Sequence, residues 1–457
     1  MKEESLFKPS TLELTPTVPV GDDSFMGIVS PYEPVIPFEY TGWRDEVNAW
    51  VDGSYLGTSI SISFTYSVKG PEARDFFKKY FVNDFDNFPV GKAKHGIMCY
   101  ENGKIMSDGV ILRIAEDEYY TVWLWPYIQY ALETSKFDAV GTLLTGQVYL
   151  FQVAGPTSLQ ILEKATGENL HDIQFLHHRM SKIAGHDVRI LRLGMAGTLA
   201  YEVHGKMEDA HDVYNAIWEA GKGEYKMKKL GYQAYMLNHT EDGYPQATYH
   251  FDYAYHDDKD FIAWLKKDPM LAFYTAKPTL LGSIGNDHES FYRNPIELGW
   301  GGMINFNHDF VGKEALAEMK KNPKRQMVTL EWNAEDIGDV FASQFRDDVP
   351  YKNMDKPNDY YNFDLSSGFT YHADKVLVNG KFVGISSGRA RCEHYHRMIS
   401  LCSIDTEYAK IGQEVTVVWG EPGTRQKEIR ATVARFPYLQ AELNKHVDVS
   451  KIPQGNK

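Results

Sequence analysis

The sequence predicts an α+β fold in which a duplicated body precedes a β-rich C-terminal domain. A strand followed by a Gly-Pro pair and a helix occurs twice, at Gly70-Pro71 and at Gly155-Pro156, and such self-similarity is typical of an internal duplication. Short strand-like segments separated by Gly and Asn turns follow residue 327, as expected for a small β domain. The length of 457 residues indicates two or three domains.

The body begins with a proline-rich N-terminal region. Six prolines stand within the first 40 residues, which favours an extended arm over residues 1–45 that wraps the body. In residues 60–67, apolar side chains alternate with Ser and Thr, and this pattern predicts a strand with one buried face. Apolar residues at helical spacing in 73–80 predict the helix of the first copy, and Pro71 suits its first turn.

The second copy repeats the strand in residues 148–154 and the helix in 159–165. Further helices are expected at 211–221 and from residue 312 onward. A polar break at 321–325 separates the expected body of two repeated α+β lobes, residues 1–323, from the C-terminal domain, residues 324–457. The strands expected in that domain are 327–332, 375–378, 382–386, 399–404, 414–419 and 429–434.

The composition excludes several classes of protein. Asp and Glu outnumber Lys and Arg by 62 to 48, a net charge of −14, which argues against nucleic acid or an anionic membrane as the partner. Three cysteines cannot form a disulfide framework in this length. No signal-peptide core and no run approaching the roughly 20 apolar residues of a membrane span is found. We therefore expect a cytoplasmic protein acting on a small molecule, in an oligomeric state that stays open.

Several blocks of residues resemble the folate-dependent aminomethyltransferase family, that of the glycine-cleavage T-protein. One is Gly70-Pro71-Glu72-Ala73 with Asn83-Asp84, and another is Asn102-Gly-Lys-Ile-Met-Ser-Asp108-Gly. Asn294-Pro295-Ile-Glu297-Leu-Gly299 and Gly384-Ile-Ser-Ser-Gly follow in the family's order. The resemblance implies three lobes around a central channel that holds tetrahydrofolate, with a β-barrel-like C-terminal domain.

Within this family, the chain length and the block Val328-Thr-Leu-Glu-Trp332-Asn are most similar to the tetrahydrofolate-dependent aromatic O-demethylases of the vanillate and syringate type. Transfer of a methyl group from an ether oxygen to N5 of the folate is an in-line displacement. Such a reaction needs alignment, exclusion of water and neutralisation of the departing oxygen. None of these requires a metal.

The resemblance also implies the cofactor-binding residues. Asp108 stands within an apolar strand, where a carboxylate is costly without a partner, and it corresponds to the family's catalytic aspartate; a turn-capping Asp is the alternative. Glu241 is similar to the glutamate that receives hydrogen bonds from the pterin's amino-amide edge, and Glu202 to a further acid of the family. Val122 and Trp123 lie on the strand that lines the folate with main chain.

Tyr274 resembles the demethylase tyrosine that faces the substrate. A phenol with an ordinary pKa near 10 is well matched to a departing phenolate, so Tyr274 is the expected proton donor. The alternative is that it simply packs, as one of the 29 tyrosines of the chain. Asp108 and Tyr274 are therefore the expected catalytic residues.

The substrate-binding positions depart from the demethylase pattern. Leu124 stands where the relatives carry an Arg suited to an aryl carboxylate, and Ser59 and Ile62 stand where they carry Gln and His. The segment 249–258, which includes Tyr253, is instead rich in aromatic and acidic residues. It could stack on an uncharged methoxyarene, hold a sulfonium or ammonium by cation–π contact, or simply pack as a surface loop. Ser59, Leu124 and Tyr253 are the expected substrate contacts.

One pattern suggests a metal. Cys392, His394 and His396 alternate, so that a strand would place all three on one face. No second cluster completes a ligand set, so no metal is predicted and the role of the three residues stays open.

The predicted function is transfer of a methyl group from an O-methylated aromatic compound to tetrahydrofolate, which gives 5-methyltetrahydrofolate. One alternative is demethylation of a sulfonium such as dimethylsulfoniopropionate, which leaves as a neutral thioether and needs no acid. Another is a folate-binding accessory protein without catalytic activity.

Overall fold

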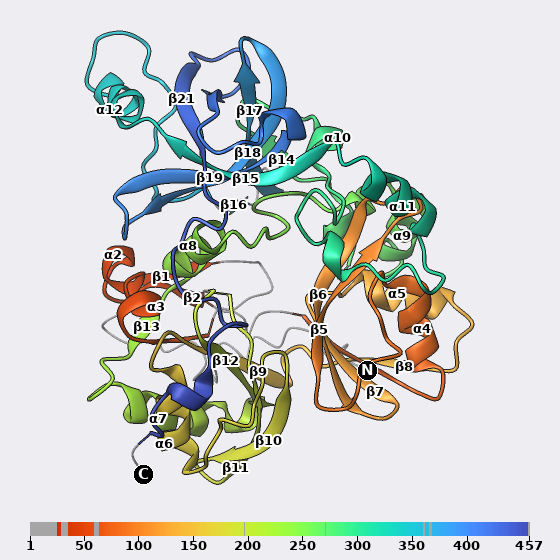
Figure 1. Ribbon diagram of the computed structural model, residues 1–457. Helices are drawn as coiled ribbons and strands as arrows, with labels where there is room; N and C mark the ends of the chain where they lie inside the picture. The colour runs from red at the N-terminus through yellow and green to blue at the C-terminus, as the bar shows by residue number, and fades with distance from the viewer. Residues whose placement is uncertain are drawn as a thin grey trace.

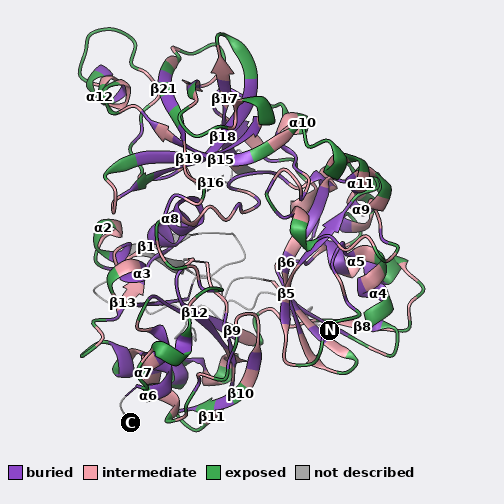
Figure 2. Ribbon diagram, in the orientation of Figure 1, coloured by how far each residue is buried: buried purple, intermediate pink, exposed green. Residues whose placement is uncertain are grey.

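The computed structural model of the chain describes residues 25–28, 35–58, 64–195, 197–269, 271–359, 362–364 and 368–455. Three lobes lie around a central region, as Figure 1 shows: two α+β lobes below and a barrel above. Each lobe has its own apolar core, and Figure 2 shows the buried residues gathered inside each of them.

The first lobe contains a five-stranded sheet in the order β5-β6-β7-β4-β8. Its elements are β4 (Thr65–Lys69), α4 (Ala73–Tyr80), β5 (Ala93–Cys99), β6 (Ile105–Ala115), β7 (Glu118–Val122), α5 (Tyr127–Thr134) and β8 (Val140–Leu143). The apolar face of α4, with Phe76 and Phe77, is fully buried in the core of this lobe. The predicted helix at 73–80 is therefore confirmed, and its burial explains its spacing.

The second lobe contains a six-stranded sheet in the order β10-β11-β12-β9-β3-β13. Its elements are β3 (Tyr55–Gly57), β9 (Val148–Ala154), α6 (Ser158–Thr166), β10 (His178–Ile183), β11 (His186–Leu191), β12 (Ala200–Lys206), η2 (Met207–Asp209), α7 (Ala210–Gly221) and β13 (Lys228–Leu230). The helices α6 and α7 pack against each other. Both were expected from apolar spacing alone.

The two lobes repeat one another, which confirms the predicted duplication. In each lobe, a strand and a helix are followed by a three-stranded antiparallel meander. The third strand of the meander pairs antiparallel with the first strand of the unit: β7 with β4, and β12 with β9. Gly70 and Gly155 take positive φ angles of 154° and 126°. Their carbonyls accept equivalent turn hydrogen bonds, from Ala73 N at 3.1 Å and from Ser158 N at 3.0 Å.

The strand predicted at 60–67 requires a correction. Residues 59–63 lie outside the described residues, and β4 begins at Thr65. Thr65, Tyr66, Ser67 and Val68 are all buried, because β4 is an inner strand between β7 and β8 and both of its faces are covered. The expected solvent-facing side is therefore wrong for the described part of this strand.

The N-terminal region and the segment between the second lobe and the barrel contribute shorter elements. Residues 1–24 and 29–34 of the expected arm lie outside the described residues. The remaining elements are β1 (Phe25–Ile28), β2 (Val35–Glu39), α2 (Trp43–Glu46), α3 (Ala49–Asp52), α8 (Tyr232–Asp242), η3 (Ala254–Asp257), α9 (Lys259–Leu265), η4 (Ala272–Thr275), β14 (Thr279–Leu281), α10 (His288–Phe291), η5 (Gly301–Met303) and α11 (Lys313–Lys321). β1 and β2 form a hairpin, and β2 contacts α8.

The third lobe is a closed barrel. Its elements are β15 (Arg325–Trp332), α12 (Ala334–Ser343), β16 (Asn362–Asp364), β17 (Gly368–Val378), β18 (Lys381–Cys392), β19 (Arg397–Asp405), η6 (Thr406–Tyr408), β20 (Glu414–Trp419) and β21 (Lys427–Ala434). The order β17-β18-β19-β15-β21-β20 closes because β20 also pairs with β17. The predicted β-rich domain is confirmed as a six-stranded barrel around Trp332 and Trp419.

Beyond the barrel, the chain returns to the second lobe, where it ends in η7 (Val449–Lys451) and the residues that follow. Asn444 N donates to Gly197 O at 2.8 Å, and Gly455 N donates to Glu163 Oε2, on α6, at 2.7 Å. Figure 1 shows this last segment beside α6 and α7. The predicted domain boundary between residues 323 and 324 stays a prediction.

Candidate active site

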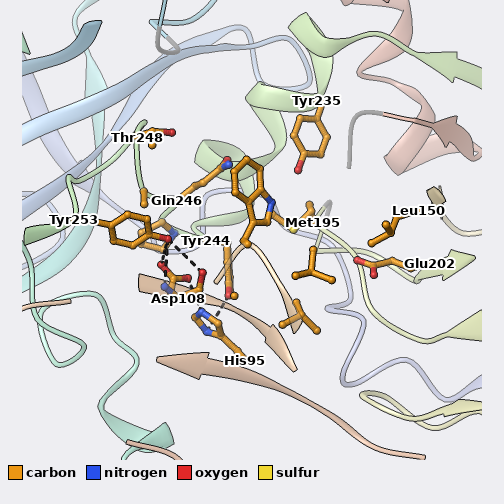
Figure 3. Close-up of a pocket in the computed structure, with 16 residues that line it drawn as sticks. His95, Asp108, Leu150, Met195, Glu202, Tyr235, Tyr244, Gln246, Thr248 and Tyr253 are labelled. Atoms are coloured by element: carbon orange, nitrogen blue, oxygen red, sulfur yellow. Dashed lines mark hydrogen bonds and ion pairs between the residues drawn. The ribbon is translucent and has the colours of Figure 1, made fainter. Parts of the chain in front are cut away.

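The first lobe, the second lobe and the segment that follows α8 enclose one pocket. Its empty space, the open mouth included, is about 760 Å³. We call it the interlobe pocket, and it is lined by His95, Asp108, Gly109, Val110, Val122, Trp123, Leu150, Met195, Glu202, Tyr235, Tyr244, Pro245, Gln246, Ala247, Thr248 and Tyr253. Figure 3 shows how many of these side chains converge.

Asp108 is the most completely bonded acid of this pocket. It lies on β6, where its neighbour across the hairpin is Ile97 of β5. Its Oδ2 lies 2.7 Å from His95 Nε2, and its Oδ1 accepts a hydrogen bond from Tyr253 Oη at 2.8 Å. Both contacts are drawn in Figure 3. The partner that a carboxylate needs within an apolar strand is therefore present.

The bonded chain continues from His95 to Tyr244. Tyr244 Oη lies 3.0 Å from His95 Nδ1, and the imidazole meets Trp300 edge-on at 4.6 Å. Burial and the negative charge of Asp108 raise the pKa of Tyr253 and of Tyr244 well above 10. Both phenols thus keep their protons at neutral pH, and Tyr253 stays a donor toward Asp108.

Glu202 brings a second carboxylate to the pocket from the other lobe. It lies on β12, and its Oε2 is 2.9 Å from His204 Nε2, two residues further on the same face of the strand. Its side chain is 7% exposed. The pocket therefore has one carboxylate on each side, and each is held by a histidine.

Val122 and Trp123 line the pocket at the end of β7, and their predicted contact with the folate stays a prediction. Trp123 has a positive φ of 73°, which is uncommon for a bulky residue, and its N–H donates to Phe64 O at 2.9 Å. A residue held in this sparsely populated region needs support from its surroundings, and such residues cluster at functional sites.

Glu241 lies outside the interlobe pocket, on the last turn of α8. It is fully buried, and neither carboxylate oxygen has a well-formed hydrogen bond to a described residue. The Trp50 indole and the Cys392 thiol are polar groups that interact with it, and His394 Nε2 is 3.8 Å from its Oε2. Burial raises the pKa of Glu241 to about 7. Its predicted role in holding the pterin stays a prediction, and Glu202 is the glutamate that lines the same pocket as Asp108.

The expected substrate residues are dispersed. Tyr253 lines the pocket, whereas Leu124 is fully buried in the core of the first lobe and Ser59 lies outside the described residues. Tyr274, the expected proton donor, does not line the pocket: it meets Phe64 and Trp125 edge-on at 6.1 and 6.0 Å. Their assigned roles stay predictions.

The structure adds pocket residues that the sequence did not indicate, notably His95, Tyr244, Gln246 and Met195. The Oε1 atom of Gln246 is buried and has no hydrogen-bond partner among the described residues. Only the pairing of β5 with β6 brings His95 near Asp108, and that pairing cannot be read from spacing along the chain.

The Cys392–His396 pattern does not form one strand face. β18 ends at Cys392 and β19 begins at Arg397, so the intervening residues form the hairpin turn, in which His396 takes a φ of 52°. Cys392 is buried while His396 is exposed. Among the described residues, no three His, Cys, Asp or Glu side chains are grouped to hold a metal ion.

The pocket suits a reduced folate. A tetrahydropterin presents mainly N–H donors along its edge, and the residues that line the pocket include two acceptors, the Asp108 and Glu202 carboxylates. The aromatic wall that includes Trp123 and Tyr235 suits its flat ring. Asp108, Glu202, Val122 and Trp123 are the residues that would hold it.

The lobed fold and the pocket between the lobes define a T-protein-like transferase. The family described as the GCVT N-terminal domain matches residues 29–259. This chain belongs to that family.

The chain is 45% identical to a sesamin methylene transferase of Sinomonas sp. (strain No.22), over 92% of this chain and 94% of the relative. It is 33% identical to a syringate O-demethylase of Sphingobium sp. (strain NBRC 103272 / SYK-6), over 91% and 92%. Its fold is similar to that of the glycine cleavage system aminomethyltransferase T from Bartonella henselae, with a TM-score of 0.65, 15% identity and coverage of 92% and 96%.

These findings confirm the predicted family and its T-protein-like fold. The chain is an enzyme, and tetrahydrofolate is its cofactor, as predicted. No helix of the described residues has the length and apolar character needed to cross a bilayer.

Proposed function

We propose that this enzyme transfers the one-carbon group of an aromatic ether to tetrahydrofolate. In the first form, an O-methylated aromatic compound yields a phenol and 5-methyltetrahydrofolate. The observation that supports it best is the interlobe pocket, in which two carboxylates face a wall of aromatic side chains. The similarity to the syringate O-demethylase over nine tenths of both chains is a second support.

The chain's own residues would align the reactants and move protons. Tetrahydrofolate supplies the amine nitrogen that accepts the carbon. The Asp108 carboxylate can receive the proton that this amine must lose. His95 Nε2, 2.7 Å from Asp108 Oδ2, can share that proton. The lobes on either side of the pocket restrict water, which strengthens these interactions.

The departing aryl oxygen needs a proton, and two tyrosines are candidates to supply it. Tyr274 is the residue that the sequence resemblance favours, and Tyr253 is the one in contact with Asp108. Tyr274→Phe and Tyr253→Phe separate these roles, because loss of the true proton donor slows an ether reaction about a hundredfold while folate affinity is kept.

A second candidate is transfer of a methylene bridge. The relative with 45% identity is a methylene transferase for sesamin, a compound whose rings carry methylenedioxy groups. In this form both ether oxygens leave as hydroxyl groups of a catechol, and the carbon bridges two folate nitrogens as 5,10-methylenetetrahydrofolate. The same pocket would serve both forms.

Incubation with tetrahydrofolate and a panel of methoxyarenes and methylenedioxyarenes tests the proposal. Formation of 5-methyl- or 5,10-methylenetetrahydrofolate, identified by mass spectrometry, distinguishes the two forms. Folate binding without turnover of any aromatic ether would contradict the proposal and favour the accessory-protein alternative. A sulfonium compound in the same panel tests S-demethylation.

We also propose the cytoplasm as the location, since it is where a folate pool and reduced cysteines coexist.

A further inference from the structure

We infer that the aromatic ether accepted by this pocket carries no acid group, so that the enzyme discriminates against aryl carboxylates. This inference rests on the proposed function and specifies its substrate class. It starts from the charges of the interlobe pocket, in which carboxylates of Asp108 and Glu202 stand on opposite sides.

Among the described residues that line the pocket, there is no Lys or Arg to act as counter-ion to a third carboxylate. Arg192 is close along the chain, but its guanidinium is buried on the carbonyls of Asn444 and Val447. It is therefore already used in holding the C-terminal segment.

The aromatic ether must bind close to the negative charge of these carboxylates. For transfer, its ether carbon must come within about 3–3.5 Å of the accepting nitrogen, and that nitrogen lies beside Asp108 in the proposed arrangement. A carboxylate on the aryl ring then lies about 6–12 Å from Asp108, depending on its ring position. At an effective dielectric constant near 20, repulsion over that distance weakens binding by more than tenfold.

Uncharged side chains that line the interlobe pocket can bind an uncharged ether instead. The pocket lining includes Trp123, Tyr235 and Met195, which offer apolar contact to an aryl ring. The side chain of Gln246 also lines this space, and an amide can form hydrogen bonds with an aryl hydroxyl group. An acid group is not needed for recognition.

Matched compounds provide the test. Piperonyl alcohol and piperonylic acid differ only in a hydroxymethyl or carboxylate group beside one methylenedioxy ring, and vanillyl alcohol and vanillate form the corresponding methoxy pair. Affinity is measured by calorimetry with the folate-loaded enzyme, and turnover by the folate product. We expect each alcohol to bind at least tenfold more tightly than its acid and to have a correspondingly higher kcat/KM.

A charge introduced into the wall sharpens the test. Met195 lines the pocket and is half-buried, so Met195→Arg can place a cation there, with Met195→Gln as a neutral control of similar length. We expect Met195→Arg to raise the acid-to-alcohol ratio of kcat/KM at least tenfold over both the wild type and Met195→Gln.

The outcomes separate the inference from the proposed function. Equal binding of acid and alcohol, or tighter binding of the acid, overturns the inference even when ethers are turned over. Preferential binding of the alcohols without any folate product supports the selectivity and contradicts the proposed function. Absence of both binding and product contradicts both. An unchanged ratio in Met195→Arg, in a variant with wild-type folate affinity, shows that charge in this wall does not set selectivity.

Discussion

The two α+β lobes share a topology but supply the pocket in different ways. In the first lobe the acid is Asp108, on the middle strand of the three-stranded meander, β6. In the second lobe it is Glu202, on the third strand of the corresponding meander, β12. Asp108 is bound on two sides, by His95 and Tyr253. Glu202 has one described side-chain partner, His204. The duplication thus supplies a scaffold, and the site arises where its two copies differ.

This difference predicts different roles for the two acids. A carboxylate coupled to a histidine and a phenol can accept a proton and share it, which suits the reacting nitrogen. A carboxylate held by one histidine, with its other oxygen directed at the pocket, suits fixed recognition of N–H donors. The following experiments test this division and the equivalence of the two copies.

Asp108→Asn is expected to have the largest effect. The amide keeps the shape of the side chain but cannot accept a proton, so kcat should fall about 100- to 1000-fold while the Kd for tetrahydrofolate rises less than tenfold. Single-turnover kinetics and calorimetry measure the two quantities. An Asp108→Asn enzyme with unchanged kcat would remove the catalytic assignment.

The Gly-Pro turns test whether the two copies share a structural requirement. A Cβ at Gly155 would lie 2.3 Å from Gly53 O, and one at Gly70 would lie 2.5 Å from Asp138 O. Each Gly→Ala change should lower the free energy of unfolding by about 3 kcal/mol. Gly146→Ala is the control, since its φ of 77° is positive but no atom lies within 4 Å; it should cost about 1 kcal/mol. Chemical denaturation measures all three, and a tolerated Gly155→Ala would show that the turns are not equivalent.

Glu241→Gln tests the buried acid that neither copy contributes. Burial raises its pKa from 4.5 to about 7, so the folded protein binds a proton that the unfolded chain releases. Stability from this group is complete below about pH 4.5 and is lost as the pH rises through 7. The variant should therefore be more stable than the wild type by about 2–3 kcal/mol at pH 8 and similar to it at pH 4.5. Equal differences at both pH values would contradict the raised pKa.

Glu202→Gln is expected to have the smallest effect. It removes charge from an acceptor that recognises N–H donors, so the Kd for tetrahydrofolate should rise about tenfold, with kcat changed less than threefold. A larger effect on kcat than on Kd would show that the two acids do not divide their roles as proposed.

The order of elements could be predicted from the sequence, because apolar periodicity and Gly-Pro turns are local. The helix at 73–80 and the strand at 414–419 match α4 and β20 residue for residue. The family resemblance implied the barrel-like C-terminal domain, but the order of its strands and the burial of β4 on both faces could not be predicted, since each depends on which strands become neighbours.

The site divides in the same way. The block that contains Asp108 indicated this residue, the resemblance of its strand indicated Trp123, and both line the pocket. His95 and Tyr244 were missed because they are 13 and 136 residues from Asp108 along the chain. Strand pairing brings His95 to Asp108, and the segment after α8 brings Tyr244 to His95. The role of Leu124 depends on which face of its segment is buried, and that face belongs to the core.

The return of the chain from the barrel to the second lobe has a consequence for biosynthesis. Asn444 and Val447 accept the hydrogen bonds of Arg192, and Gly455 reaches Glu163 of α6. During translation, a lobe whose own strands are made early must therefore wait for residues more than 200 positions later before these contacts can form. A ribosome that stalls within the barrel would leave the second lobe incomplete, although every strand of its sheet had already emerged.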